Sequence, residues 1–193
     1  MSFCELRKPG NYCSMNPVDQ LKIEYESIVE YLSQTGQISL LSDYNRSFRK
    51  VLLLSAGSYF EHQITAVLSD FVSNKCNGDL RIITFMQKQA ISSKYHQLFD
   101  WGKQDDPEDF NDNANRFWSF FGNDFKSHIS SDLKLNESIL KSIGAFIQIG
   151  HLRNILVHSN FAAYSYDQKT TEEIYSLFKV AEPFVDYLRE KLK

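Results

Sequence analysis

The sequence predicts an all-α fold, a single-domain helical bundle of about five main helices. Apolar residues recur at three- and four-residue intervals, no long segment alternates with period two, and no internal repeat is present. The length of 193 residues suits one domain with a substantial core. Hydrophobic residues make up 42% of the chain, which indicates a folded globular protein.

The first half of the chain divides into a tail and three helical segments. Residues 1–16 carry Pro9, Gly10 and scattered polar groups, and we expect an N-terminal tail there before a helical domain over residues 17–193. Apolar spacing predicts helices over about Val18–Ser33, Leu41–Ser73 and Leu80–Phe99, with breaks at Gly36 and at Asn77-Gly78.

The second half begins with an acidic, turn-rich stretch that predicts a loop. The stretch that follows concentrates Phe117, Trp118, Phe120 and Phe121, which we expect to pack in the core rather than to stack on nucleic-acid bases. A helix is predicted from about Asn136 to His158, and a final helix from about Thr171 to Leu192. Pro183 is expected to kink or divide that last helix.

Composition narrows the class of protein. A formal net charge of −3 argues against a protein that coats nucleic acid through a broad basic surface, although a local cationic pocket stays open. Three cysteines without CxxC spacing indicate reduced thiols rather than a disulfide framework or zinc site. We find no apolar run long enough for a membrane span and no signal peptide, so we expect a cytoplasmic protein without membrane contact.

The predicted helix before residue 158 changes character near its end. At about 100° per residue, one apolar face is shared by Ile139, Ile143, Phe146, Ile147 and Gly150. The next turn on that face carries Arg153, Asn154 and His158, while Ile149, Leu152 and Leu156 lie nearly opposite. The buried face is therefore expected to change sides around Gly150.

Two interpretations of the polar face compete. Arg153 and His158 in the last turns of a helix favourably meet the negative end of its dipole, with no further role. However, they replace apolar residues instead of continuing the solvent face, and a charge in such a place needs a partner or a ligand.

The residues around this face resemble a known family. "RNILVH" resembles the R-(N/D/H)-x(3–5)-H motif of HEPN domains, and "IGHLRNILVHSNF" resembles the RiboL-PSP-HEPN branch, as does "FWSFFGNDF" upstream. The resemblance covers roughly residues 40–192 and is specific near Phe117–Phe125 and Leu152–Phe161. It implies a helical domain that forms a homodimer, with two such motifs facing each other in one cleft.

The resemblance also implies a range of activities. Many HEPN proteins are metal-independent endoribonucleases, often toxins or effectors in anti-phage and stress systems. Others are non-catalytic and bind nucleotides or partner proteins. A cognate antitoxin or other regulatory partner is expected only by analogy with the family.

The residue types suit RNA cleavage through the 2′-OH. A histidine such as His158 titrates near neutrality and can move the proton of that hydroxyl. Arg153 offers a permanent charge and paired donors to the phosphorane, and Asn154 can orient the imidazole or donate to phosphate. Arg153 and His158 lie about 140° apart on the wheel, so two copies of the motif would frame a cleft better than one.

Other residues are weaker candidates. Glu61 either pairs with Arg153 or His158 or is a solvated carboxylate; no spacing identifies such a pair, and the solvated carboxylate is the favoured interpretation. His151 borders the motif face as a candidate substrate contact, and Tyr164 is a candidate cleft residue. Asn160 matches the family stretch and is expected to cap or order the turn after the helix. "RSFRK", residues 46–50, is either a solvated basic face or a guide for a phosphate backbone.

No cofactor and no metal site are expected, because the sequence lacks HExxH, Cys/His ligand spacing and a Gly-rich phosphate loop. The leading hypothesis is a dimeric endoribonuclease with RNA as substrate and with Arg153, Asn154 and His158 as catalytic residues. The alternatives are a non-catalytic interaction module and a nucleotide-binding sensor.

Overall fold

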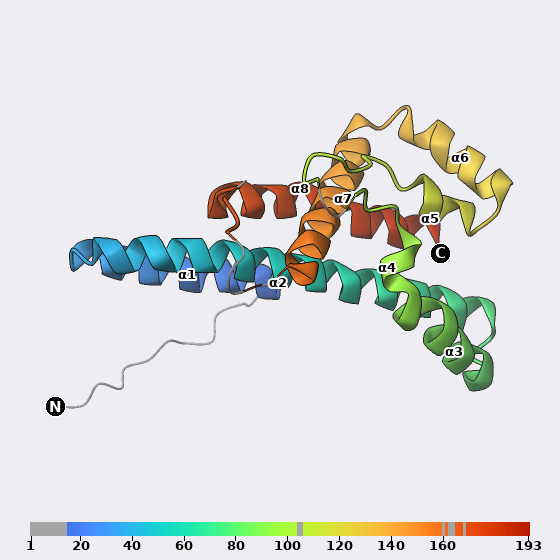
Figure 1. Ribbon diagram of the computed structural model, residues 1–193. Coiled ribbons are helices and arrows are strands. Elements are labelled where there is room, and N and C mark those ends of the chain that lie inside the picture. Colours follow the sequence, from blue (N-terminus) through green and yellow to red (C-terminus); the bar gives the residue numbers. More distant parts are fainter. Residues whose placement is uncertain (1–14, 104–105, 160, 162–164, 168) are drawn as a thin grey trace.

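The structure, a computed structural model, describes residues 15–103, 106–159, 161, 165–167 and 169–193. Within these ranges every regular element is a helix, which confirms the predicted all-α fold. Figure 1 shows the longest helix, α2 (Ile38–Lys75), running through the molecule, with the other long helices packed along it. One hydrophobic core connects helices from α1 to the C-terminal helix.

The N-terminal helix α1 (Pro17–Gln34) packs against the first half of α2. Asn16 caps it by accepting the backbone N–H of Asp19 at 2.8 Å, and Pro17 occupies the first helical position, where a missing N–H costs nothing. Most of the predicted tail, residues 1–14, lies outside the described residues.

The two helices that complete the core are α7 (Glu137–His158) and α8 (Thr171–Lys191). Asn136 caps α7, and Thr170 with Glu173 forms a capping box at the start of α8. Pro183 does not divide α8, contrary to one of the two sequence expectations. Packing against α7 holds the helix together around it, and Ser142 Oγ donates to the Ala181 carbonyl at 3.0 Å.

The predicted helix over Leu80–Phe99 is not continuous. It consists of α3 (Leu80–Met86), a π-helical turn η1 (Gln87–Ile91), a short 3-10 turn η2 (Ser92–Lys94) and α4 (Tyr95–Leu98). The π-helical turn shifts the register of the residues that follow it. As a result Ile91, Tyr95 and Phe99 are buried, whereas Phe85, before the π-helical turn, is exposed.

Two short helices follow the loop after Phe99, α5 (Asn115–Ser119) and α6 (Asn123–Leu133), and the sequence pattern did not predict either. Of the four aromatic residues expected in the core, Phe117 and Trp118 are buried and Phe121 packs partly against the core. Phe120 is exposed, so the expectation was wrong for this residue. The chain turns at Gly122, whose positive φ of 97° suits glycine.

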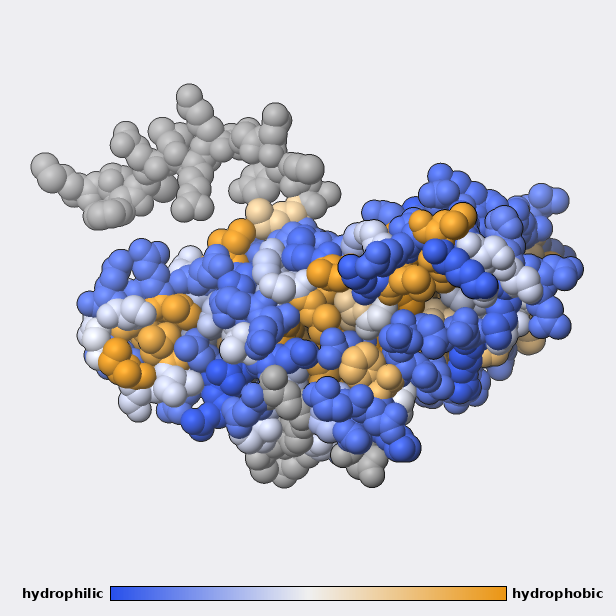
Figure 2. All heavy atoms as spheres, turned by 90° about the horizontal axis from the view of Figure 1, so that it is seen from above, coloured by the Kyte–Doolittle hydropathy of each residue, from blue (hydrophilic) through white to orange (hydrophobic). Residues whose placement is uncertain are grey.

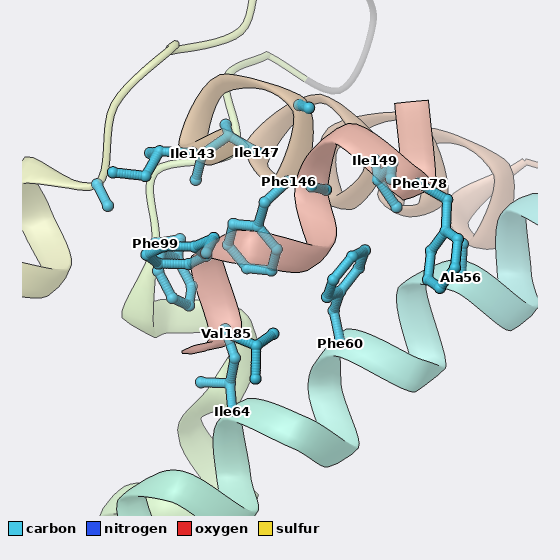
Figure 3. Packing of buried hydrophobic residues seen from close by; sticks show 14 of the residues in the cluster. Ala56, Phe60, Ile64, Phe99, Ile143, Phe146, Ile147, Ile149, Phe178 and Val185 are labelled. Atoms are coloured by element: carbon cyan, nitrogen blue, oxygen red, sulfur yellow. The ribbon is translucent and has the colours of Figure 1, made fainter. Parts of the chain in front are cut away.

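Aromatic rings from four parts of the chain meet at the centre of the core. Figure 3 shows Phe60 of α2 and Phe146 of α7 pointing toward one another, with Phe99 and Phe178 beside them. The rings of Phe60 and Phe146 pack edge to face with centroids 5.5 Å apart, and Phe99 lies 4.9 Å from Phe146. These contacts fix α7 between α2, α8 and the segment before the acidic loop.

The middle of α7 is buried on almost every side. Ile143, Phe146 and Ile147 are buried, and so are Ile149, Leu152 and Leu156 on the other side. The sequence predicted that the buried face of this helix changes sides around Gly150. This prediction was wrong, because both sides of the helix are buried at the same level. The helix opens to solvent in its first turn and again in its last turns, where Arg153, Asn154, Val157 and His158 are half-buried or exposed.

The face of the molecule in Figure 2 is mostly polar. Apolar side chains gather at the end of the molecule where α1 leads into α2, and Ile38 and Leu40 are exposed there. Among the described helices, none is long and apolar enough to cross a membrane.

Gly150 provides a stability test of the packing around α7. A Cβ at this position would overlap the six-membered ring of Trp101, whereas at Gly144 on the same helix the nearest atom, the Asp112 carbonyl oxygen, lies 3.6 Å away. We expect Gly150→Ala to lower the free energy of unfolding by about 1–3 kcal/mol through overpacking. Gly144→Ala is the matched control and should raise it by about 0.5–1 kcal/mol.

Urea denaturation of both variants measures the difference. Equal stabilisation by the two substitutions would contradict the close contact between Gly150 and Trp101.

Candidate active site

The candidate site lies at the C-terminal end of α7, where this helix packs across α2. Four side chains on one face of its last turns are half-buried or exposed: Arg153, Asn154, Val157 and His158. They line an open groove of about 590 Å³ together with Glu61 of α2 and residues of the 95–102 segment. The groove is the place where the three polar motif residues meet solvent.

Helix α2 contacts the Arg153 side chain from its aliphatic stem to its guanidinium. A Cβ on Gly57 would lie 2.9 Å from Arg153 Cγ and 3.3 Å from Arg153 Cβ, so the aliphatic stem rests on the bare backbone of this glycine. The guanidinium reaches Glu61, one turn further along α2, with Nη2 donating to Oε2 at 3.4 Å. The short contact at Gly57 thus aims the charged group into the groove.

Glu61 forms an ion pair with Arg153, one of the two interpretations that the sequence left open. The pair is long at 3.4 Å, and the Arg153 side chain keeps 27% of its surface exposed. Exposed pairs of this kind stabilise proteins by about 0–1 kcal/mol. An anionic ligand can therefore replace the carboxylate at small cost.

Asn154 is bonded to the arginine and not to the histidine. Its Oδ1 accepts from Arg153 Nη1 at 3.3 Å. The sequence led us to expect that Asn154 orients the imidazole of His158, but in this structure the Asn154 side chain does not contact that ring. The amide of Asn154 instead restrains the guanidinium of Arg153. Together Asn154 and Glu61 hold Arg153 from two sides.

His158 is the last residue of α7, and its side chain is exposed. Within the described part of the chain no group forms a hydrogen bond or ion pair with its imidazole. The ring borders the same groove as Arg153. A free imidazole next to a fixed guanidinium is an arrangement suited to proton transfer at a phosphate ester.

Tyr95 forms part of the groove wall, although it is not among the site candidates from the sequence. Burial raises the pKa of its hydroxyl, and the charge of Glu61 raises that pKa further while Arg153 opposes it. The phenol therefore stays neutral at physiological pH. His96 and Arg116 also line the groove and were missed, because no linear spacing relates residues 95–116 to the motif.

His151 is buried and serves packing. Its Nε2 lies 2.9 Å from the carbonyl oxygen of Asp106, and its ring lies 5.6 Å from that of Phe110. These contacts tie the loop before α5 to α7. His151 also lies in the wall of the groove, so its role in substrate binding stays a prediction. The other two candidates, Asn160 and Tyr164, lie outside the described residues.

The basic cluster at residues 46–50 is only partly a solvated face. Lys50 is buried, its Nζ donates to the Phe161 carbonyl at 2.8 Å, and it lies 5.1 Å from the centre of the Phe161 ring. Arg49 pairs with Asp167 at 3.5 Å. Two residues of α2 therefore hold the connection that follows the motif helix.

No group of three or more His, Cys, Asp or Glu side chains in the described ranges is placed to hold a metal ion. Arg153, Asn154 and His158 are also poor metal ligands as a set, because a guanidinium carries a permanent positive charge and has no acceptor. The chemistry that the site offers is that of a cation, an amide and an imidazole.

A helical domain with an Arg-Asn-x3-His motif at the open end of a central helix defines the HEPN class. The chain belongs to the RiboL-PSP-HEPN family, whose family model matches residues 19–193. No curated protein and no solved structure is significantly similar to the chain. The family assignment made from the motif residues is thereby confirmed.

Lys50 gives a stability test of the connection after α7. We expect Lys50→Met to lower the free energy of unfolding by about 2 kcal/mol, because a buried charge-assisted hydrogen bond to the Phe161 carbonyl is lost. Arg46→Met, in the same basic cluster but exposed, should change it by no more than about 0.5 kcal/mol. Chemical denaturation compares the two, and equal effects would refute the anchoring role of Lys50.

Proposed function

We propose that the protein is a metal-independent endoribonuclease that cleaves RNA through the 2′-OH. The observation that carries the proposal is the shared groove of Arg153 and His158, in which the guanidinium is held in place and the imidazole is free. Membership of the RiboL-PSP-HEPN family supports a nuclease or nucleotide-binding role.

The reaction assigns one task to each group. The 2′-oxygen attacks the adjacent phosphorus, the bond from phosphorus to the 5′-oxygen breaks, and the products are a 2′,3′-cyclic phosphate and a 5′-hydroxyl. A histidine removes the proton from the 2′-OH, and a second imidazole returns a proton to the departing 5′-oxygen. Arg153 stabilises the charge on the phosphorane after the phosphate has displaced Glu61.

A homodimer supplies the second imidazole. Two copies meeting at the ends of their α7 helices bring two Arg153 and two His158 side chains to one cleft. Val157, between the motif residues, is 51% exposed, and Phe161 just beyond the helix is also exposed. Apolar side chains at the rim of a polar groove favour coverage by a second protein surface.

Arg153→Ala and His158→Ala are expected to lower RNA cleavage at least about 10²-fold each while the protein stays folded, because each removes a group that acts in the transition state. His128→Ala, an exposed histidine on α6, is the matched control and should cleave like the parent. The assay uses purified protein, total RNA and EDTA, with detection of 2′,3′-cyclic phosphate ends.

Full activity in both motif variants would show that the site is misassigned. Intact RNA with the parent protein as well, in all conditions, would favour the alternative, a non-catalytic module that binds nucleotides or a partner protein.

The dimer is tested by placing a charge at its proposed centre. Val157→Glu is expected to convert the protein to a monomer and to abolish cleavage, because like charges face each other across the two-fold axis. Val180→Glu on α8 is the matched control, since Val180 is 48% exposed but remote in sequence from the motif. Analytical ultracentrifugation gives the mass; an unchanged mass for Val157→Glu would refute this interface.

A further inference from the structure

A second groove adjoins the candidate active site. It has a volume of about 570 Å³ and lies between the last turns of α2, the segment from Met86 to Leu98, and α5. Gln97 and Arg116 line both grooves, so these two side chains lie between the candidate active site and the second groove. The size is that of a site for a small organic group.

The floor of this second groove is aromatic. Phe71, Phe117 and Phe121 pack against one another, with ring centroids 5.3 Å and 5.8 Å apart for the two pairs that contain Phe121. Phe120 also lines the groove, but it is 60% exposed, and no other described ring lies against it. The ring of Phe120 is therefore available to a ligand, whereas the other three rings are engaged in packing.

The charged groups of this groove are cationic. Lys94 and Arg116 line it, no acidic side chain does, and neither cation pairs with a carboxylate among the residues described. Free cations beside an aromatic ring suit a phosphate joined to a planar base, because the phosphate is drawn to the charge while the base stacks. A purely apolar ligand gains nothing from these cations.

Amide side chains complete the chemistry. Gln89 and Gln97 line the groove, and Gln89 belongs to the π-helical turn η1, a distortion that is frequent at functional sites. Each amide carries both a donor and an acceptor, which suits the edge of a nucleobase. The wall thus offers ring, amide and cation within one depression.

We propose that this second groove binds one unpaired RNA base next to the phosphate that is cleaved, with Phe120 as the stacking platform. Arg116, between the two grooves, binds the phosphate that links this base to the cleavage position. The inference rests on the proposed function, because it places the same RNA strand across both grooves. A base inside a duplex has both faces stacked on its neighbours, so the base that stacks on Phe120 has to come from an unpaired, unstacked position.

The test measures binding apart from cleavage. A fluorescent single-stranded oligoribonucleotide with 2′-O-methyl sugars, which cannot be cleaved through the 2′-OH, is titrated with His158→Ala protein, and fluorescence anisotropy gives the Kd. Phe120→Ala in this background should weaken binding about tenfold, as the loss of one stacked base does. Phe85→Ala is the matched control, since Phe85 is 62% exposed but outside the groove, and should leave the Kd unchanged.

A second experiment tests whether Phe120 contacts a base of the oligonucleotide. An abasic residue is moved one position at a time along the oligonucleotide. One position should weaken binding to Phe120-containing protein about tenfold and should have no effect on Phe120→Ala protein, since base and ring form one interaction. Thermal unfolding checks that both phenylalanine variants are folded.

The outcomes separate this inference from the proposed function. An unchanged Kd in Phe120→Ala protein, or equal abasic effects in both proteins, overturns the base site even when Arg153→Ala has lost cleavage. Conversely, a Phe120-dependent Kd together with RNA that the parent protein leaves intact supports the base site and refutes the nuclease. Undetectable binding of the oligonucleotide by the parent background overturns the base site.

Discussion

The close approach of α7 to α2 at Gly57 is the constraint on which the site depends. The missing side chain lets the stem of Arg153 lie on the backbone of α2 and directs the guanidinium to Glu61. The same approach brings Phe60 of α2 against Phe146 of α7 in the core. One helix crossing therefore fixes both the apolar centre of the molecule and the position of its functional cation.

Burial of the middle of α7 explains why the motif residues reach solvent at its C-terminal end. In its middle the helix is enclosed by α2, α8 and the 99–114 segment, with Trp101 lying on Gly150 and His151 holding the loop at Asp106. Such surroundings accept few polar groups. The last two turns leave this enclosure, and the motif residues reach solvent from a rigid support, as a preorganised site requires.

The sequence predicted the parts of the fold that local pattern controls. The bounds of α7 and α8 follow from apolar spacing and from caps at Asn136 and Thr170, and the motif was visible within one helix. The π-helical turn at 87–91 and the exposed ring of Phe120 were not predictable, since packing against distant helices decides them. Tyr95, His96 and Arg116 reach the groove only through tertiary folding, and no spacing in the chain marks them.

The pairing of Arg153 with Glu61 has a consequence for how salt acts on this protein. Cations condensed along a nucleic acid are released when positive charges of a protein neutralise its phosphates, and this release makes affinity fall as salt rises. Arg153 already has a carboxylate as its counterion, so an RNA phosphate exchanges one fixed anion for another. If the protein binds RNA as proposed, the salt sensitivity of binding should come mainly from Arg116 and Lys94, which pair with no carboxylate among the described residues, because Arg153 and Glu61 together carry no net charge.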